Sequence, residues 1–88
     1  MTGLKKVCEI PLNRKVISFF HENPSTVDTS RAIAAWLNCE RKEVKKALDY
    51  LVTQGILLPH RIGASTAYAY TQDKKIIFKI EKILNIQT

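Results

Sequence analysis

The chain has 88 residues, which is enough for one small domain. Its shares of hydrophobic residues, 45%, and of charged residues, 25%, are those of a globular protein, and no segment approaches the roughly 20 apolar residues of a membrane span. The formal net charge of +6 favours polyanionic partners, although the basic residues are spread along the chain and only folding can gather them into a patch.

Neither metal binding nor catalysis is expected from the reactive residue types. Cys8 and Cys39 lie far apart without Cys-x-x-Cys spacing, and the two histidines are isolated. The sequence contains no Gly-rich phosphate loop and no Gly-x-Ser-x-Gly motif, so we expect no cofactor and no enzymatic activity. The early apolar run is broken by Glu9 and Pro11 and does not resemble a secretory signal, so we expect free thiols in a reducing cytoplasm.

The first part of the chain is expected to hold one helix. Residues 1–11 show no clear period and are expected to form a partly ordered arm. Apolar residues recur mostly at helical spacing from Leu12, and Asn23-Pro24 ends this helix because the residue before proline avoids helical backbone angles. Val27 follows as a lone apolar residue in a β-friendly context, with room for only a stub of strand.

Two further helices are expected in the middle of the chain. The first starts at one of three good N-cap residues, 28–30, and ends near Leu37-Asn38. The second is longer, over residues 40–54, with an apolar stripe opposite its charges, and Gly55 ends it as a left-handed cap residue.

A hairpin and a last helix complete the predicted elements. Residues 56–58 and 68–70 have the composition of strands, and 63–66 form the tip between them, which gives a two-stranded β-hairpin over 56–70. From about Asp73 the period is helical again, so a C-terminal helix is expected over 73–88.

The stretch from Arg31 to Leu57 carries a regular pattern of apolar positions. Its members are Ile33, Ala34, Leu37, Val44, Leu48, Leu51, Gly55, Ile56 and Leu57. This pattern, within the order helix, strand stub, helix, tight turn, helix and hairpin over residues 12–72, resembles the winged helix-turn-helix family of DNA-binding transcriptional regulators, including MarR-like and ArsR-like repressors. Ala34 is small where the two helices of the motif must cross closely.

The resemblance implies an α+β fold that is mainly α, with a three-helix core, a two-stranded β-wing and an added C-terminal helix. Two residues depart from the family pattern: Asn38 stands where the family often has glycine, and Glu40 where it often has a serine cap. Asparagine tolerates the left-handed conformation, so we expect the turn to survive, while Glu40 caps the next helix less well.

The resemblance also implies that the exposed face of the helix over 40–54 enters the major groove of double-stranded DNA, where lysine and arginine donate to guanine edges or phosphates. The alternative is a merely solvated helix face. The start of the second helix and the wing are expected to contact phosphates. The predicted DNA-binding residues are Thr29, Ser30, Arg31, Arg41, Lys42, Lys45, Lys46 and Arg61. We expect Asp49 to pair with Lys45 one turn away.

We therefore expect sequence-specific binding of double-stranded DNA by a small cytoplasmic transcriptional regulator. The alternative is a winged-helix module that uses the same basic face, or the wing, against an acidic protein partner, because the fold alone does not decide function.

Two expectations concern apolar side chains. The C-terminal helix carries a broad apolar stripe with Phe78 on the far side, which favours a homodimer, and the alternative is that it folds back onto its own chain. The predicted dimerisation residues are Ile76, Ile77, Phe78, Ile80, Ile83 and Leu84.

Four aromatic residues are expected in the core rather than as stacking platforms for single-stranded nucleic acid: Phe19, Phe20, Trp36 and Tyr50. Of these, Trp36 has the weakest case for burial.

Overall fold

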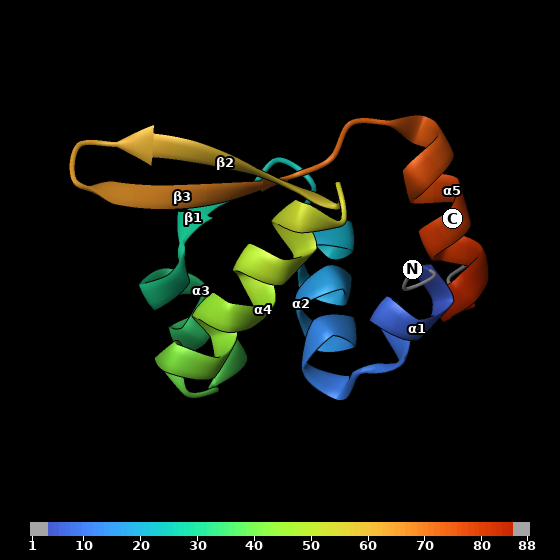
Figure 1. Cartoon of the computed structure of the whole chain (residues 1–88), viewed down its shortest axis with the longest axis horizontal. Coiled ribbons are helices and arrows are strands. Elements are labelled where there is room, and N and C mark those ends of the chain that lie inside the picture. Colours follow the sequence, from blue (N-terminus) through green and yellow to red (C-terminus); the bar gives the residue numbers. More distant parts are fainter. Residues whose placement is uncertain (1–3, 86–88) are drawn as a thin grey trace.

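The computed structural model describes residues 4–85, which form an α+β fold of five helices and one three-stranded antiparallel sheet (Figure 1). The helices are α1 (Leu4–Glu9), α2 (Pro11–Glu22), α3 (Ser30–Leu37), α4 (Arg41–Thr53) and α5 (Lys74–Leu84). The strands are β1 (Val27–Thr29), β2 (Leu57–Ile62) and β3 (Ser65–Tyr70), and their order in the sheet is β1-β3-β2. The β2–β3 hairpin extends to one side of the helices, while α1 and α5 lie together on the opposite side (Figure 1).

The sheet is larger than the predicted two-stranded hairpin. The stub at Val27 forms β1, which pairs with β3 so that Thr29 lies opposite Ala67. The strands of the hairpin are also longer than expected, and only Gly63 and Ala64 remain as its tip. Because β3 is the central strand, it holds the start of α3 through β1 and the rest of the hairpin through β2.

The tight turn between α3 and α4 depends on Asn38. This residue is left-handed, with φ 54°, and the amide of Cys39 donates to the carbonyl of Ala34 at 3.0 Å, which satisfies a carbonyl at the helix end. The expectation that asparagine preserves this turn is confirmed. Glu40 precedes α4 without a side-chain capping bond, as its weaker capping predicts.

Gly55 ends α4 in a left-handed conformation, with φ 76°, as expected. Its amide donates to the carbonyl of Val52 and that of Ile56 to the carbonyl of Leu51, both at 3.0 Å. No atom lies within 4 Å of the position that a Cβ would take. The glycine is therefore required by the backbone angle and not by space.

One hydrophobic core joins all five helices and the sheet. Phe20 is fully buried, as expected, and Phe19 and Tyr50 are partly buried against the core. The expectation for Trp36 is wrong, because its side chain is 73% exposed. The core reaches α1 at Val7 and Cys8 and α5 at Ile80 and Leu84.

The expected arm over residues 1–11 is wrong for residues 4–9, which form helix α1. Val7 and Cys8 are fully buried, and the buried amide of Asn13 donates to the carbonyl of Val7 at 3.2 Å. Burial raises the pKa of the Cys8 thiol, and the nearby Arg14 opposes this shift in part. Both cysteines are free thiols. Residues 1–3 lie outside the described part of the chain.

Helix α5 packs within its own chain, so the predicted dimer interface needs a correction. Ile80 is fully buried and Leu84 is 5% exposed, which leaves neither available to a second copy. A contact of 3.3 Å between His21 on α2 and Glu81 adds to the packing against α1. The helix was expected over residues 73–88, and the structure ends it at Leu84 with Asn85 as its cap residue. Residues 86–88 lie outside the described part of the chain.

The remaining apolar residues of α5 divide between the core and solvent. Ile76, Ile77 and Ile83 are partly buried against the same core, whereas Phe78 is 56% exposed and lies on the far side, as expected. Ile80 and Leu84 therefore follow the alternative expectation, in which this helix folds back onto its own chain.

Among residues 4–85, no helix combines the length and the apolar character needed to cross a bilayer.

Substitution of Ile80 should separate the buried from the exposed side of α5. We expect Ile80→Ala to lower the free energy of unfolding by about 2–5 kcal/mol, because it leaves a cavity between α5 and the core. The control Phe78→Ala should cost less than about 0.5 kcal/mol, as is usual for exposed positions. Urea denaturation followed by circular dichroism measures both, and equal losses would contradict this packing of α5.

Candidate nucleic-acid interface

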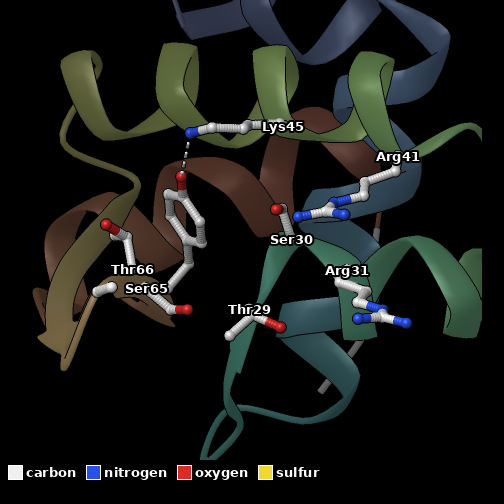
Figure 2. Close-up of a pocket in the computed structure, with 9 residues that line it drawn as sticks. Thr29, Ser30, Arg31, Arg41, Lys45, Ser65 and Thr66 are labelled. Carbon is white, nitrogen blue, oxygen red and sulfur yellow. Dashed lines mark hydrogen bonds between the residues drawn. The ribbon is translucent and has the colours of Figure 1, made fainter.

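A cleft of about 370 Å³ opens where the start of α3, the face of α4 and the tip of the hairpin meet (Figure 2). It is lined by Thr29, Ser30, Arg31, Arg41, Lys45, Ala64, Ser65, Thr66 and Tyr68. Five of the predicted DNA-binding residues, from two separate segments of the chain, therefore meet at one place.

The floor of the cleft is the N-terminus of α3. The Thr29 hydroxyl caps this helix by accepting from the amide of Ala32 at 3.3 Å. The first amides of a helix have no acceptor within it and carry the positive end of its dipole, so they attract anions. Ser30 is 8% exposed, and its hydroxyl makes no hydrogen bond within the described residues although it lines the cleft. A hydroxyl that is open to the cleft beside a helix N-terminus can donate to an oxygen of a bound anion.

The walls of the cleft are cationic. Arg31 comes from α3, and Arg41 and Lys45 come from α4, whereas no carboxylate is among the lining residues. Figure 2 shows the Arg41 side chain extending from α4 toward the start of α3, where Ser30 lies. Ser65 and Thr66 line the cleft from the hairpin, and Figure 2 shows the Ser65 hydroxyl directed toward the start of α3. This set of cations, hydroxyls and helix amides is the donor set that binds phosphate groups.

The exposed face of α4 continues from the cleft. Lys42 and Lys46 lie there beside Arg41 and Lys45, along a hollow that Glu40 and Asp49 also line. Lys46 contacts Glu43 at 3.7 Å, with both side chains more than half exposed, so this surface pair adds little stability. The four predicted cations of α4 thus form one surface, and carboxylates border it.

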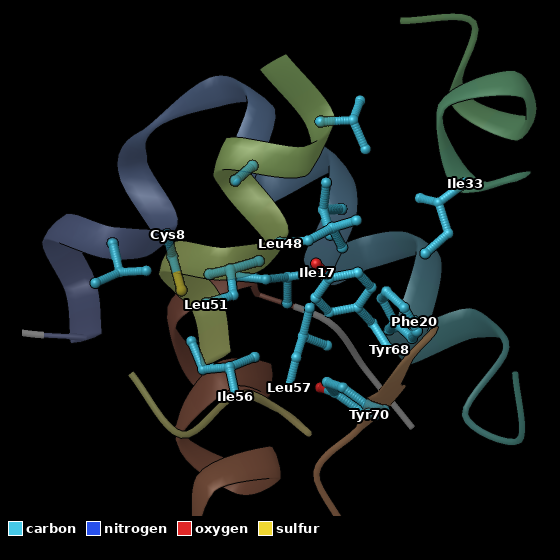
Figure 3. Close-up of a cluster of buried hydrophobic side chains, with 14 of the residues drawn as sticks. Cys8, Ile17, Phe20, Ile33, Leu48, Leu51, Ile56, Leu57, Tyr68 and Tyr70 are labelled. Atoms are coloured by element: carbon cyan, nitrogen blue, oxygen red, sulfur yellow. The ribbon is translucent and has the colours of Figure 1, made fainter. Parts of the chain in front are cut away.

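A network of three side chains joins α4 to β3. Lys45 contacts Asp49 at 3.0 Å, which confirms the expected pair, and the Tyr68 hydroxyl donates to the same carboxylate at 2.5 Å. Lys45 also donates to the Tyr68 hydroxyl at 3.4 Å. The Tyr68 ring itself is 1% exposed and belongs to the cluster of buried side chains that includes Phe20 and Leu48 (Figure 3).

The network shifts the ionisation of its members. Partial burial raises the pKa of Asp49, but the hydrogen bonds from Tyr68 and Lys45 outweigh it and hold the pKa below its usual value. The bonds to Asp49 and then to Tyr68 raise the pKa of Lys45. Lys45 therefore stays charged at the edge of the cleft.

Arg61 lies neither in the cleft nor along the hollow on α4. It is exposed on β2, directly opposite Thr66 of β3. Cross-strand partners point to the same face of a sheet, so Arg61 lies on the face that carries Thr66 and Tyr68. Its charge extends the cationic surface along the hairpin.

Four lining residues were missed by the sequence analysis: Ala64, Ser65, Thr66 and Tyr68. The period of two from Thr66 to Tyr68 places both side chains on one face of β3, and this was the available signal. Nothing local in the sequence indicates which element that face meets.

No protein-family model, curated protein or solved structure matches this chain, so its function has to be inferred from the geometry of residues 4–85. Within that part of the chain, no group of three or more histidine, cysteine or acidic residues is placed to hold a metal ion.

Removing the Tyr68 hydroxyl should change the titration of Asp49. Because the pKa of Asp49 is lowered in the folded chain, its contribution to stability is present above the unfolded pKa and is lost as the pH falls through the folded pKa. We expect Tyr68→Phe to raise the Asp49 pKa and to cost about 0.5–1 kcal/mol at neutral pH, since Asp49 is half exposed.

An NMR titration of the Asp49 carboxyl, with urea denaturation at neutral and acidic pH, measures both effects. The stability difference between the two proteins should shrink at acidic pH. Tyr50→Phe serves as the control, because Tyr50 donates no side-chain hydrogen bond within the described residues. An unchanged Asp49 titration in Tyr68→Phe would show that this network does not form in solution.

Proposed function

We propose that this chain binds double-stranded DNA as a small winged helix-turn-helix regulator of transcription in the cytoplasm, and that it has no catalytic activity. In this proposal α4 is the recognition helix and the β2–β3 hairpin is the wing. The observation that carries it is the cleft beside α4, where three cations, two hairpin hydroxyls and the start of α3 meet without a carboxylate.

The two parts of the surface have different roles in the proposal. The cleft receives a backbone phosphate, which positions the protein on the duplex but carries no sequence information. Lys42 and Lys46, on the exposed face of α4, extend into the major groove, which is wide enough to admit a helix, and donate to base edges. Arg61 contacts a phosphate further along the same strand.

Two carboxylates, Asp49 and Glu43, lie near the cations of α4. A carboxylate repels phosphates, so these cations can bind DNA only if the two carboxylates are paired with other groups or directed away from the DNA backbone. Asp49 is held by Tyr68 and Lys45, and Glu43 contacts Lys46. Their charges are therefore partly balanced within the protein, which lowers the repulsion that a duplex would meet.

A homodimer through α5 stays a prediction. It can use Phe78 and the part-buried Ile76, Ile77 and Ile83, since the other two predicted residues are buried in their own chain. A two-fold pair would place two recognition helices in successive major grooves, about 34–36 Å apart.

Removing cations from the cleft should weaken DNA binding far more than removing cations elsewhere. We expect Arg31→Ala with Arg41→Ala to reduce the affinity for a mixed-sequence duplex at least about tenfold, because two phosphate contacts are lost. The salt dependence of the affinity should become shallower by about two phosphate equivalents. Fluorescence anisotropy with a labelled duplex at about 50 and 200 mM salt measures both quantities.

The matched control is Lys74→Ala with Lys79→Ala, which removes two charges from exposed positions on α5. It should change affinity less than about threefold, since only the overall field is altered. Equal losses in the two double variants would mean that net charge and not the cleft binds DNA. Salt-independent binding of an acidic protein, with no duplex binding, would instead favour the interaction module.

A further inference from the structure

A second hollow lies on the side of α3 that carries Trp36. Its volume is about 370 Å³, and the residues that line it are Phe19, Glu22, Asn23, Thr26, Asp28 and Trp36. We call it the Trp36 hollow. Trp36 is 73% exposed, and its ring lies beside that of Phe19 with 6.5 Å between the centroids. The indole therefore has one aromatic neighbour and a large surface open to solvent.

The charged groups of the Trp36 hollow are both carboxylates. Glu22 and Asp28 supply carboxylates, and neither is in an ion pair within residues 4–85. The side-chain amide of Asn23 donates to the carbonyl of Phe19 at 2.9 Å, which leaves its oxygen free to accept. No lysine, arginine or histidine lines the hollow.

The turn after α2 fixes this arrangement. The amide of Thr26 donates to the carbonyl of Asn23 at 3.0 Å, and that of Asn23 to the carbonyls of Phe19 and Phe20. Asp28 follows in β1, where it pairs with Tyr68 of the central strand. The two carboxylates are thus carried by hydrogen-bonded elements on both sides of the hollow.

Aromatic faces beside carboxylates attract a cation. The face of an indole is the best of the aromatic side chains for a cation–π contact, and arginine is suited to it because its planar, weakly hydrated guanidinium stacks on aromatic rings. Tryptophan is also one of the residue types enriched among the energetically dominant positions of protein interfaces. In a chain with a net charge of +6, an acidic and aromatic hollow of this kind is out of keeping with the rest of the surface.

We propose that the Trp36 hollow is a docking site for a partner protein that presents an arginine or lysine beside an apolar side chain. The cation lies against the Trp36 ring and pairs with Glu22 and Asp28, and the apolar side chain packs on Phe19. DNA does not fit the same site, because two carboxylates without cations repel phosphates. The proposal is independent of DNA binding by the cleft.

A model peptide tests this site directly, because Trp36 is the single tryptophan of the chain. The probe is a blocked peptide with the sequence Gly-Leu-Arg-Leu-Arg-Gly, and its counterpart has glutamine in place of both arginines. We expect the arginine peptide to shift the indole N–H resonance and the fluorescence of Trp36, with an affinity at least about fivefold above that of the glutamine peptide.

Variants then assign the binding to the hollow. Glu22→Gln with Asp28→Asn should lower the affinity for the arginine peptide at least about fivefold. Trp36→Ala, followed through the backbone amide of Asp28, should lower it at least as much. Ile62→Ala is the matched control, since Ile62 is 60% exposed on the hairpin, and it should have no effect.

Three results would overturn the proposal. The first is no saturable shift at Trp36, and the second is equal binding of the arginine and glutamine peptides. The third is self-association in sedimentation equilibrium that Trp36→Ala abolishes, which would show that a second copy occupies the hollow. None of these measurements involves DNA, so they stand whatever the duplex experiments give.

Discussion

The position of Tyr68 determines how the elements of the cleft are placed. Its ring is packed into the hydrophobic core, and its hydroxyl reaches the carboxylate of Asp49 on α4. Because β3 pairs with both other strands, this one side chain fixes α4 relative to the whole sheet. β1 leads directly into the cap of α3 at Thr29, and β2 carries Arg61. The separation between the start of α3, the cations of α4 and the hairpin tip therefore follows from how this one side chain is packed and hydrogen-bonded.

The core also explains why α1 and α5 are present. A chain of this length buries only about 60–65% of the surface that its unfolded form exposes, so each added apolar contact matters for stability. Val7 and Cys8 from one end of the chain and Ile80 and Leu84 from the other complete the core on the side away from the hairpin. Helices α1 and α5 thus lie apart from the cleft and do not cover the surface of α4.

The features that were predictable from the sequence are local. The helix caps, the left-handed Asn38 and Gly55, and the contact between Lys45 and Asp49 each depend on residues within one turn, where spacing is a direct signal. The features that were missed depend on distant contacts. Tyr68 and Asp49 are 19 positions apart, and their meeting is set by how the hairpin packs on α4.

The helix α1 and the surface at Trp36 were missed for related reasons. Helix α1 is only six residues long, so its spacing of Leu4, Val7 and Cys8 gives too few repeats to establish a period. Trp36 lies on a helix whose buried face is supplied by Ile33 and Ala34, and its ring stays exposed beside Phe19 of α2, a neighbour 17 positions away in the sequence.

The most direct test of the proposed function is an NMR titration of the isotope-labelled protein with a duplex of about 20 base pairs, two helical turns. We expect the amides of residues 29–31, 41–46 and 64–66 to shift together. Shifts centred on α5 or on the Trp36 hollow, or no shifts at all, would contradict the proposed DNA binding.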